Sequence, residues 1–127
     1  MAATKKYTRK LTYNERMFIA GDEICPPLIN QLFFDGEGSF DLKKWRDAVA
    51  RASDANPGSR LVLRGFLGMS RWVDSGVTPP VTEIDGGSWD ATGPDGAPFL
   101  QKRLMPAQGP TSEVILITGK THRVGFR

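Results

Sequence analysis

The segment Val114-Ile115-Leu116-Ile117 is apolar at every position, and this feature constrains the fold more than any other. Successive side chains of a β-strand point to opposite faces of a sheet, so a strand with this sequence is apolar on both faces. Strands of that kind lie buried in the middle of a sheet. The chain is therefore expected to fold around a sheet that has this segment at its centre.

Residues 41–52 predict the main helix that packs on this sheet. Four apolar side chains recur at spacings of three, four and three residues, which places them on one face of a helix. These residues are Leu42, Trp45, Val49 and Ala52. Asp41 is a suitable N-cap, because its carboxylate can accept a hydrogen bond from a backbone N–H of the first turn. We expect Trp45 to be buried against the sheet.

A shorter helix and several strands are predicted elsewhere. Thr12 and Glu15 have the spacing of a capping box, and Gly21 is the expected end of the helix that they begin. The predicted strands are Ile29–Phe34, Leu61–Leu67, Arg71–Val73, Val81–Ile84, and one made of Pro98–Leu100 with Arg103–Met105. Residues 85–98 are rich in Gly, Asp and Pro and predict a loop. This order predicts an α+β fold, a mixed sheet with helices packed on one face.

Length and charge limit the domain organisation. The chain has 127 residues, which is enough for one domain with a core. Its net charge is +3, and part of this charge comes from Lys5, Lys6, Arg9 and Lys10. A basic cluster can be a nucleic-acid-binding arm, but no aromatic platform or recognition motif accompanies it here. We therefore interpret residues 1–10 as a solvated basic tail and residues 11–127 as the folded part.

The single cysteine, Cys25, and the single histidine, His122, restrict the possible chemistry. One cysteine cannot form an internal disulfide, and one Cys with one His cannot build a usual zinc site. A nucleophilic Cys25–His122 dyad is an alternative, but Asp22 and Glu23 beside the cysteine disfavour its thiolate. We interpret Cys25 as a structural or loop residue.

The hydropathy pattern predicts a soluble protein. No apolar run in the sequence is long enough to span a bilayer. The basic amino terminus is not followed by the apolar stretch of a secretory signal. Together with the unpaired cysteine, this indicates a reducing compartment, and we expect a cytoplasmic location.

Six short motifs follow one another along the chain in a definite order. They are Leu11-Thr12-Tyr13-Asn14-Glu15-Arg16, the strand Ile29 to Gly36, Phe40-Asp41-Leu42 to Val49, Asn56-Pro57-Gly58-Ser59-Arg60, Ala97-Pro98-Phe99-Leu100 to Leu104, and the strand Val114 to Thr118 that leads to Thr121-His122. Their order resembles the amino-terminal part of the condensation domains of nonribosomal peptide synthetases, which have the chloramphenicol acetyltransferase-like fold.

The resemblance implies an acyltransferase that forms an amide or ester bond from a thioester-bound acyl donor. The donor would be carried on phosphopantetheine by an acyl or peptidyl carrier protein, or be a coenzyme A thioester, and the acceptor would be an amine or an alcohol. No tightly bound cofactor and no metal are implied. Such enzymes serve the biosynthesis of secondary metabolites.

The resemblance also implies roles for individual residues. His122 falls at the second histidine of the family's His-His-x-x-x-Asp-Gly motif and would be the general base. Thr121 replaces the first histidine, and Arg60 matches the arginine of an earlier motif. Phe126 and Arg127 stand where the motif has Asp and Gly, so the ion pair and the tight turn of that loop are not matched.

The family's domain is several times longer than this chain and has two lobes with the donor tunnel between them. We therefore expect a truncated amino-terminal lobe that is inactive alone and that self-associates through the apolar surface its missing lobe would cover. The alternative is a non-catalytic interaction module, which docks a carrier protein or contacts nucleic acid through its basic tail. No membrane partner is expected.

Overall fold

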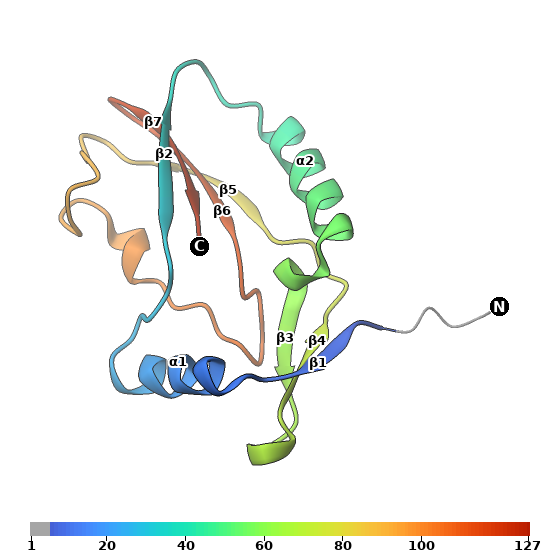
Figure 1. The fold of residues 1–127 in the computed structure, drawn as a ribbon. Coiled ribbons are helices and arrows are strands. Elements are labelled where there is room, and N and C mark those ends of the chain that lie inside the picture. The colour runs from blue at the N-terminus through green and yellow to red at the C-terminus, as the bar shows by residue number, and fades with distance from the viewer. Residues whose placement is uncertain (1–5) are drawn as a thin grey trace.

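The structure is a computed structural model that describes residues 6–127, and its strands form two sheets (Figure 1). The strands are β1 (Thr8–Lys10), β2 (Leu32–Gly36), β3 (Leu61–Arg64), β4 (Arg71–Asp74), β5 (Val81–Asp85), β6 (Val114–Thr118) and β7 (His122–Phe126). A three-stranded antiparallel sheet has the order β1-β4-β3, and a four-stranded sheet has the order β2-β7-β6-β5. In the larger sheet β5 and β6 are parallel and the other pairs are antiparallel. The predicted α+β class with a mixed sheet is confirmed.

β6 lies between β5 and β7 and is buried on both faces, as its apolar sequence predicts. Val114 and Leu116 face helix α2 (Leu42–Ala55). Ile115 and Ile117 face the loop that follows β5. The strand therefore connects two separate apolar clusters, one on each side of the sheet.

Helix α2 covers one face of the four-stranded sheet. Asp41 caps it as predicted, because its carboxylate accepts a hydrogen bond from the backbone N–H of Lys44 at 3.0 Å. Leu42, Trp45 and Val49 are half-buried and pack against the sheet. The predicted contact of Trp45 with the sheet is confirmed.

The carboxyl-terminal half of α2 differs from the predicted stripe. Ala52 is exposed, whereas the neighbouring Ser53 is buried. At about 100° per residue, Ser53 lies about 20° from Leu42 around the helix and Ala52 about 20° from Trp45, so both lie toward the sheet-facing side of α2. Both line a groove with Val114 and Phe126, and Ala52 stays exposed there.

Helix α1 (Tyr13–Ile24) begins with the predicted capping box. The backbone N–H of Thr12 donates to the Glu15 carboxylate at 2.7 Å, and the backbone N–H of Glu15 donates to the Thr12 hydroxyl at 3.3 Å. The guanidinium of Arg9 bonds the same carboxylate and lowers the pKa of Glu15 to about 2. The helix passes Gly21, its predicted end, and stops before two prolines that cannot donate backbone hydrogen bonds.

Helix α1 lies at the opposite end of the molecule from the β6–β7 hairpin and does not share the face that α2 covers (Figure 1). Its polar contacts are with irregular segments: Arg16 donates to the carbonyl of Leu67 at 3.0 Å, and Arg103 donates to Asp22 at 2.6 Å. The expectation that both helices pack on one face is therefore wrong for α1. Long-range pairs such as Arg103–Asp22 place α1, and its local sequence does not predict them.

Two predicted strands are corrected by the structure. Pro98–Gln101 form a short 3-10 helix, η3, and no strand follows in residues 102–105, so the predicted third strand is wrong. A proline is well tolerated in the first turn of a helix, because its missing N–H has no helical partner there. Strand β2 begins at Leu32 and not at Ile29.

The predicted tail is partly a strand. Residues 8–10 form β1, in which Thr8 lies opposite Val73 of β4. β1 is an edge strand, and such strands are held by their neighbour more than by their own sequence. Residues 1–5, which include Lys5 of the basic cluster, lie outside the described residues.

The predicted loop after β5 is irregular but closely packed. Trp89 is 7% exposed, and its ring meets those of Phe33 and Phe99 edge-on at centroid distances of 5.2 and 5.3 Å. The indole N–H donates to the carbonyl of Gly93 at 2.8 Å. Arg123 of β7 donates to the carbonyl of Trp89 at 2.7 Å and lies over its ring. This loop therefore serves as the second layer of the sheet.

Candidate functional site

His122 is the first residue of β7, at the hairpin that joins β6 to β7. It lies opposite Gly36 of β2, and its Nδ1 is hydrogen-bonded to the carbonyl oxygen of Gly38. The half-buried ring lies 5.4 Å from the ring of Phe40, measured between centroids. The connection between β2 and α2 therefore holds the imidazole.

The contact with Gly38 determines which nitrogen carries the hydrogen in the neutral ring. A carbonyl oxygen can only accept, so Nδ1 donates and Nε2 is left to accept a proton. A general base needs this form of the ring. A histidine with a structural role makes the same contact, and the catalytic role of His122 stays a prediction.

Thr121 belongs to the short hairpin between β6 and β7 and directly precedes His122. The backbone of this hairpin touches the loop after β5, because the N–H of Lys120 donates to the carbonyl of Gly87 at 3.1 Å. Gly119 has a φ of +149°, and a Cβ built there would lie 2.5 Å from the same oxygen. Glycine is therefore required at the point where the hairpin meets the loop.

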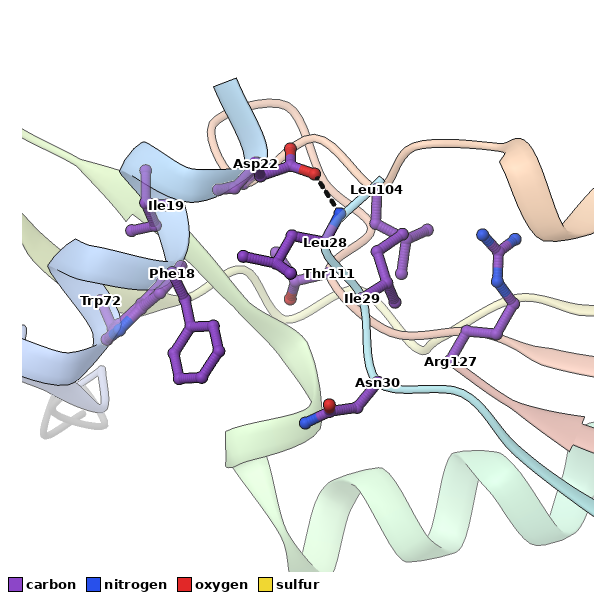
Figure 2. A pocket seen from close by; sticks show the side chains of 11 residues that line it. Phe18, Ile19, Asp22, Leu28, Ile29, Asn30, Trp72, Leu104, Thr111 and Arg127 are labelled. Carbon is purple, nitrogen blue, oxygen red and sulfur yellow. Dashed lines mark hydrogen bonds between the residues drawn. The ribbon is translucent and has the colours of Figure 1, made fainter. Parts of the chain in front are cut away.

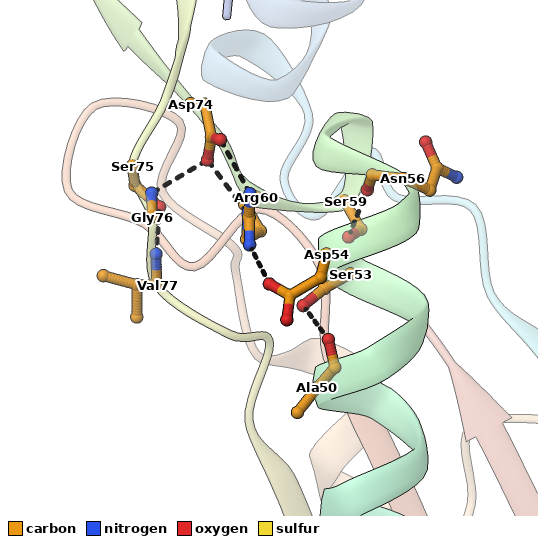
Figure 3. Close-up of polar contacts among 10 residues, drawn as sticks. All are labelled: Ala50, Ser53, Asp54, Asn56, Ser59, Arg60, Asp74, Ser75, Gly76 and Val77. Carbon is orange, nitrogen blue, oxygen red and sulfur yellow. Dashed lines mark hydrogen bonds and ion pairs between the residues drawn. The ribbon is translucent and has the colours of Figure 1, made fainter. Parts of the chain in front are cut away.

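Arg60 ends the 3-10 helix η1 (Pro57–Arg60) and is held by two carboxylates (Figure 3). Its Nε and Nη2 donate to Asp74 at 3.0 and 2.8 Å, and its Nη1 donates to Asp54 at 2.6 Å. The side chains of Arg60 and Asp74 are 14% and 12% exposed. The guanidinium lowers the pKa of Asp74 below its usual range. These bonds join the end of α2 to β4.

The structure does not bring Arg60 and His122 together. The residue before Arg60 is bonded to the segment that leads into β6, because the Ser112 hydroxyl donates to the carbonyl of Ser59 at 2.6 Å. The next residue, Glu113, exchanges two backbone hydrogen bonds with Arg127. Arg60 therefore lies near the carboxyl end of β7 and His122 at its amino end, about 13 Å away along the strand.

The backbone of residues 122–126 differs from the loop that the resemblance implies. These residues form β7, which pairs with both β2 and β6. The departures of Phe126 and Arg127 from the motif therefore fall at the end of a strand in this chain. The alternation of Val124 and Phe126 with Arg123 and Gly125, after a glycine turn, is the sequence signal that predicts this strand.

A buried ion pair fixes the carboxyl end of β7, and the sequence did not reveal it. Arg127 donates to the carboxylate of Glu113 at 2.6 Å, and the two side chains are 0% and 2% exposed. Lys102 donates to the other carboxylate oxygen at 3.0 Å. Buried charges of this kind are found paired, so a glutamate directly before the apolar strand is the only local hint of this cluster.

The structure gives no support to the Cys25–His122 dyad. Cys25 is exposed and caps the carboxyl end of α1, whereas His122 opens β7. Helix α1 and the β6–β7 hairpin lie at opposite ends of the molecule (Figure 1). Within residues 6–127, no group of three or more His, Cys, Asp or Glu residues could hold a metal ion. In the same part of the chain, no helix has the length and apolar character needed to cross a membrane.

The predicted site residues do not gather around one cavity. A cavity of about 420 Å³ lies between α1 and the segments around it, and Phe18, Leu28, Trp72 and Leu104 line it (Figure 2). Arg60 lines a different cavity of about 310 Å³. Neither cavity is lined by His122. The position that the resemblance assigns to catalysis thus lies at the hairpin, outside both of these cavities.

Comparison with known proteins identifies the fold. No family model and no curated protein matches the chain. Among solved structures, the epimerization domain from the third module of tyrocidine synthetase B has a TM-score of 0.67 and 15% identity, over 99% of this chain and 31% of that chain. The condensation domain from the Monacolin K polyketide synthase MokA has a TM-score of 0.69 and 12% identity, over 94% of this chain and 29% of that chain.

A nonribosomal peptide synthetase, FmoA3, is also similar, with a TM-score of 0.60 and 21% identity over 97% of this chain and 12% of that chain. The chain spans 29–31% of the length of the two single domains. At these identities the likeness concerns the fold, and it extends over nearly the whole chain. The chain therefore has the fold of a part of a condensation-type domain, of the chloramphenicol acetyltransferase-like class.

Proposed function

We propose that this chain is part of a condensation-type acyltransferase, which forms an amide or an ester bond from a thioester-bound acyl donor. The fold carries the proposal, since 94–99% of the chain matches condensation and epimerization domains at TM-scores of 0.67–0.69. The order of the six sequence motifs points to the same class. Because the chain spans 29–31% of those domains, the activity belongs to a larger protein that contains the remaining fold.

In the proposed reaction an amine or a hydroxyl group attacks the carbonyl carbon of the thioester. The carbon–sulfur bond breaks, the sulfur leaves as a thiol, and a base takes the proton that the nucleophile loses. The donor is a substrate: an acyl group on phosphopantetheine, presented by a carrier protein, or a coenzyme A thioester. The carrier protein is the partner that this chemistry requires.

His122 is the base that the motif order assigns. Its Nε2 is free of the hydrogen bond that Nδ1 makes with Gly38, which suits the acceptance of a proton. The competing hypothesis gives His122 a structural role, the attachment of the β6–β7 hairpin to the backbone of Gly38. In that arrangement the base belongs to another part of the complete fold.

Two substitutions at His122 separate these hypotheses. His122→Asn keeps a donor near the carbonyl of Gly38 but cannot act as a base, whereas His122→Ala removes both functions. If His122 is the base, both variants of the complete gene product lose about 10²–10⁴-fold in kcat. If its role is structural, the asparagine variant retains activity and the alanine variant loses stability.

The assay uses the complete gene product, a synthetic pantetheine thioester donor and an amine, with product detection by mass spectrometry. We expect turnover by the complete protein and none by the 127-residue chain alone. Turnover by the 127-residue chain would contradict the proposal that the activity needs the remaining fold. Failure of the complete protein to transfer any acyl group to an amine or an alcohol would remove the proposed function.

A non-catalytic interaction module is the second candidate, and one observation favours it. Several large apolar side chains are exposed, among them Met17 of α1 and Phe34 of β2. A contact with nucleic acid is less favoured than a protein contact, because Arg9 of the basic cluster is paired with Glu15. Binding of a carrier protein without acyl transfer in the same assay would support the module.

A further inference from the structure

The hairpin that joins β3 to β4 carries three exposed apolar side chains at its tip. Phe66, Leu67 and Met69 are 72%, 71% and 81% exposed. Figure 1 shows this tip, which contains the 3-10 helix η2 (Leu67–Met69), projecting beyond helix α1. A single exposed apolar residue is ordinary on a protein surface, but large apolar side chains grouped on one projection indicate a surface that contacts another molecule. We call Phe66, Leu67 and Met69 the apolar tip.

The backbone of the apolar tip is strained at Leu67. Its φ is +47°, which lies in the left-handed region that glycine adopts and leucine avoids. Gly65, in the same turn, is required by the backbone, because its φ is +88° and a Cβ there would lie 2.7 Å from the carbonyl oxygen of Met69. An exposed leucine in a strained position contributes little to folding, and strain of this kind gathers at functional sites. Leu67 therefore indicates a contact outside the chain.

Helix α1 holds the apolar tip in place. Arg16 donates from Nη1 to the carbonyl of Leu67 at 3.0 Å and from Nη2 to the carbonyl of Gly68 at 3.5 Å. Tyr13 and Met17 lie on the same side of the helix as Arg16, because residues three and four apart are neighbours on a helix surface. They are 76% and 57% exposed. The apolar surface around the tip therefore includes the first two turns of α1.

A row of three cations crosses the three-stranded sheet at the base of the apolar tip. In the strand register Lys10 of β1 lies opposite Arg71 of β4, and Arg71 lies opposite Arg64 of β3. Residues directly opposite each other in an antiparallel sheet project from the same face, so the three positive side chains are neighbours. All three residues are exposed. We call Lys10, Arg71 and Arg64 the basic row.

The charge of the basic row is not neutralised within residues 6–127. None of its three members forms an ion pair there, and Arg64 donates only to backbone carbonyls. The Glu15 carboxylate of α1 is bonded to Arg9. The Asp74 carboxylate of β4 is bonded to Arg60. Like charges directly opposite each other destabilise a sheet, so the arrangement suits an anionic partner outside the chain.

We propose that the apolar tip inserts into the surface of an anionic lipid bilayer while the basic row binds the lipid phosphates. The basic row lies two residues from the apolar tip on both strands of the hairpin, which corresponds to about 7 Å of extended chain. The headgroup region on each side of a bilayer is about 5–7 Å thick. A tip at the boundary of the acyl chains therefore places the basic row at the level of the phosphates. Such an insertion needs no membrane-spanning segment.

The apolar tip favours a bilayer over a nucleic acid or an acidic protein. The basic row alone would also suit nucleic-acid phosphates, but leucine and methionine side chains do not stack on bases. A protein partner would need a pocket shaped for the projecting tip, whereas hydrocarbon accepts apolar side chains without a matched shape. The inference goes beyond the proposed acyl transfer and does not depend on it, because it uses none of the candidate site residues.

Sedimentation with lipid vesicles tests the proposal in the complete gene product. One set of vesicles is phosphatidylcholine alone, and the other is an equal mixture of phosphatidylcholine and phosphatidylglycerol. The tip variant combines Phe66→Ser with Met69→Ser. Its matched control combines Ile24→Ser with Val77→Ser, at positions outside the tip that are 85% and 66% exposed. Circular dichroism checks that each variant is folded.

A second pair of variants tests the basic row. The charge variant combines Lys10→Gln with Arg71→Gln. Its matched control combines Lys44→Gln with Arg51→Gln, which removes the same charge from exposed positions of α2. The same measurements at high salt show how much of the binding is electrostatic, because salt screens exposed charges.

We expect the wild type to bind the mixed vesicles and to bind phosphatidylcholine vesicles much more weakly. The charge variant should bind the mixed vesicles at least about tenfold more weakly, since each basic residue near an anionic surface contributes about fivefold. The tip variant should also lose at least about tenfold, because two large apolar side chains no longer enter the bilayer. Both controls should bind like the wild type.

Leu67→Gly separates a lost contact from a lost fold. Glycine relieves the strain at this position, so urea unfolding should show an equal or higher stability while vesicle binding falls. Wild-type binding by this variant and by the tip variant would overturn the insertion of the tip.

Three further results would overturn the inference. They are a wild type that does not bind the mixed vesicles, an equal loss of binding in a variant and its control, and binding of a single-stranded oligonucleotide in place of vesicles. The last result would favour a nucleic-acid surface. The vesicle assay contains no acyl donor, so its failure leaves the proposed acyl transfer untouched, and a failure of acyl transfer leaves the membrane contact in place.

Discussion

The two faces of the four-stranded sheet are covered in different ways, although the same strand, β6, contributes to both. On one face the irregular loop after β5 forms a closed cluster in which Trp89 packs against Phe33 and Phe99. On the other face a regular helix, α2, leaves Phe34 and Phe126 exposed. The irregular segment thus gives the more complete cover.

The two covers differ in the width of sheet that they span and in how the polar groups of their backbones find hydrogen-bond partners. A helix is straight and covers about the width of two strands, whereas a loop can spread across the sheet. A loop that lies on an apolar surface must find partners for its backbone polar groups. Here Arg123 of β7 donates to the carbonyl of Trp89, and the Trp89 indole donates to the carbonyl of Gly93. A loop can therefore act as a core layer when the sheet itself supplies hydrogen bonds.

The largest effect on stability is expected from Trp89→Ala, which removes the central side chain of the apolar cluster under the loop after β5. We expect a loss of about 3–5 kcal/mol in the free energy of unfolding, because a nearly buried indole leaves a cavity. Trp45→Ala on the α2 face is the matched variant, and it should cost clearly less because Trp45 is only half-buried. Urea unfolding of both variants measures the difference, and equal losses would contradict the contrast between the faces.

Arg123→Met tests the polar support of the loop. The substitution leaves the carbonyl of Trp89 without its donor in a buried place, and we expect a loss of about 1–3 kcal/mol. Lys43→Met is the control, since Lys43 pairs with Asp47 on the exposed side of α2 and should leave the stability nearly unchanged. Urea unfolding measures both, and a loss at Arg123 no larger than the control would show that packing alone holds the loop.

A smaller effect on stability is expected from Asp90 in the loop after β5, and this effect should depend on pH. The backbone N–H and the hydroxyl of Thr92 donate to the carboxylate of Asp90 at 3.0 and 2.6 Å, and these bonds lower the pKa of Asp90. A carboxyl with a lowered pKa stabilises the fold above its unfolded pKa of about 3.9, and this contribution is lost as the pH falls through its folded pKa.

We therefore compare the unfolding free energy of wild type and Asp90→Asn between about pH 5 and pH 2. The wild type should be the more stable protein at the upper end, and the difference should shrink toward the acid end. The comparison of two proteins isolates Asp90 from the other carboxyls that titrate in this range. A difference that is constant with pH would show that these bonds do not stabilise the loop.

The smallest effect on stability is expected from Phe34→Lys on the exposed apolar part of the sheet face, which also contains Leu32 and Phe126. The side chain is 57% exposed, so the change in unfolding free energy should stay within about 0.5 kcal/mol. The same variant should reduce the self-association that we expect of the isolated chain, because it places a charge on the exposed apolar face. Sedimentation velocity at several concentrations measures this, and unchanged association would direct attention to other exposed apolar residues, such as Met17 of α1.

The elements that the sequence predicts well are those whose signal is local. The capping box of Thr12 and Glu15, the Asp41 cap and the apolar run Val114–Ile117 each lie within a few residues, and the structure confirms all three. The order of such elements was sufficient for the α+β class and for the resemblance to condensation domains, whose fold the chain has.

The candidate site was predicted less completely, because its geometry depends on contacts between distant residues. Arg60 pairs with Asp74, and Arg127 pairs with Glu113, each across 14 residues, and neither pairing has a local signal. His122 was placed after the apolar strand by its motif position alone, and the register of β7 against β2 and β6 makes it the start of a further strand.

Periodicity and capping act over one or two turns of chain, so the local sequence was enough to predict the central strand, the two capped helices and the sheet-facing side of α2. Long-range packing makes Trp89 of a Gly-rich loop part of the core and places Arg60 and His122 near opposite ends of β7. The physical reason is that strand pairing and loop packing are chosen by the partner segment. That partner segment lies dozens of residues away, and the local sequence does not identify it.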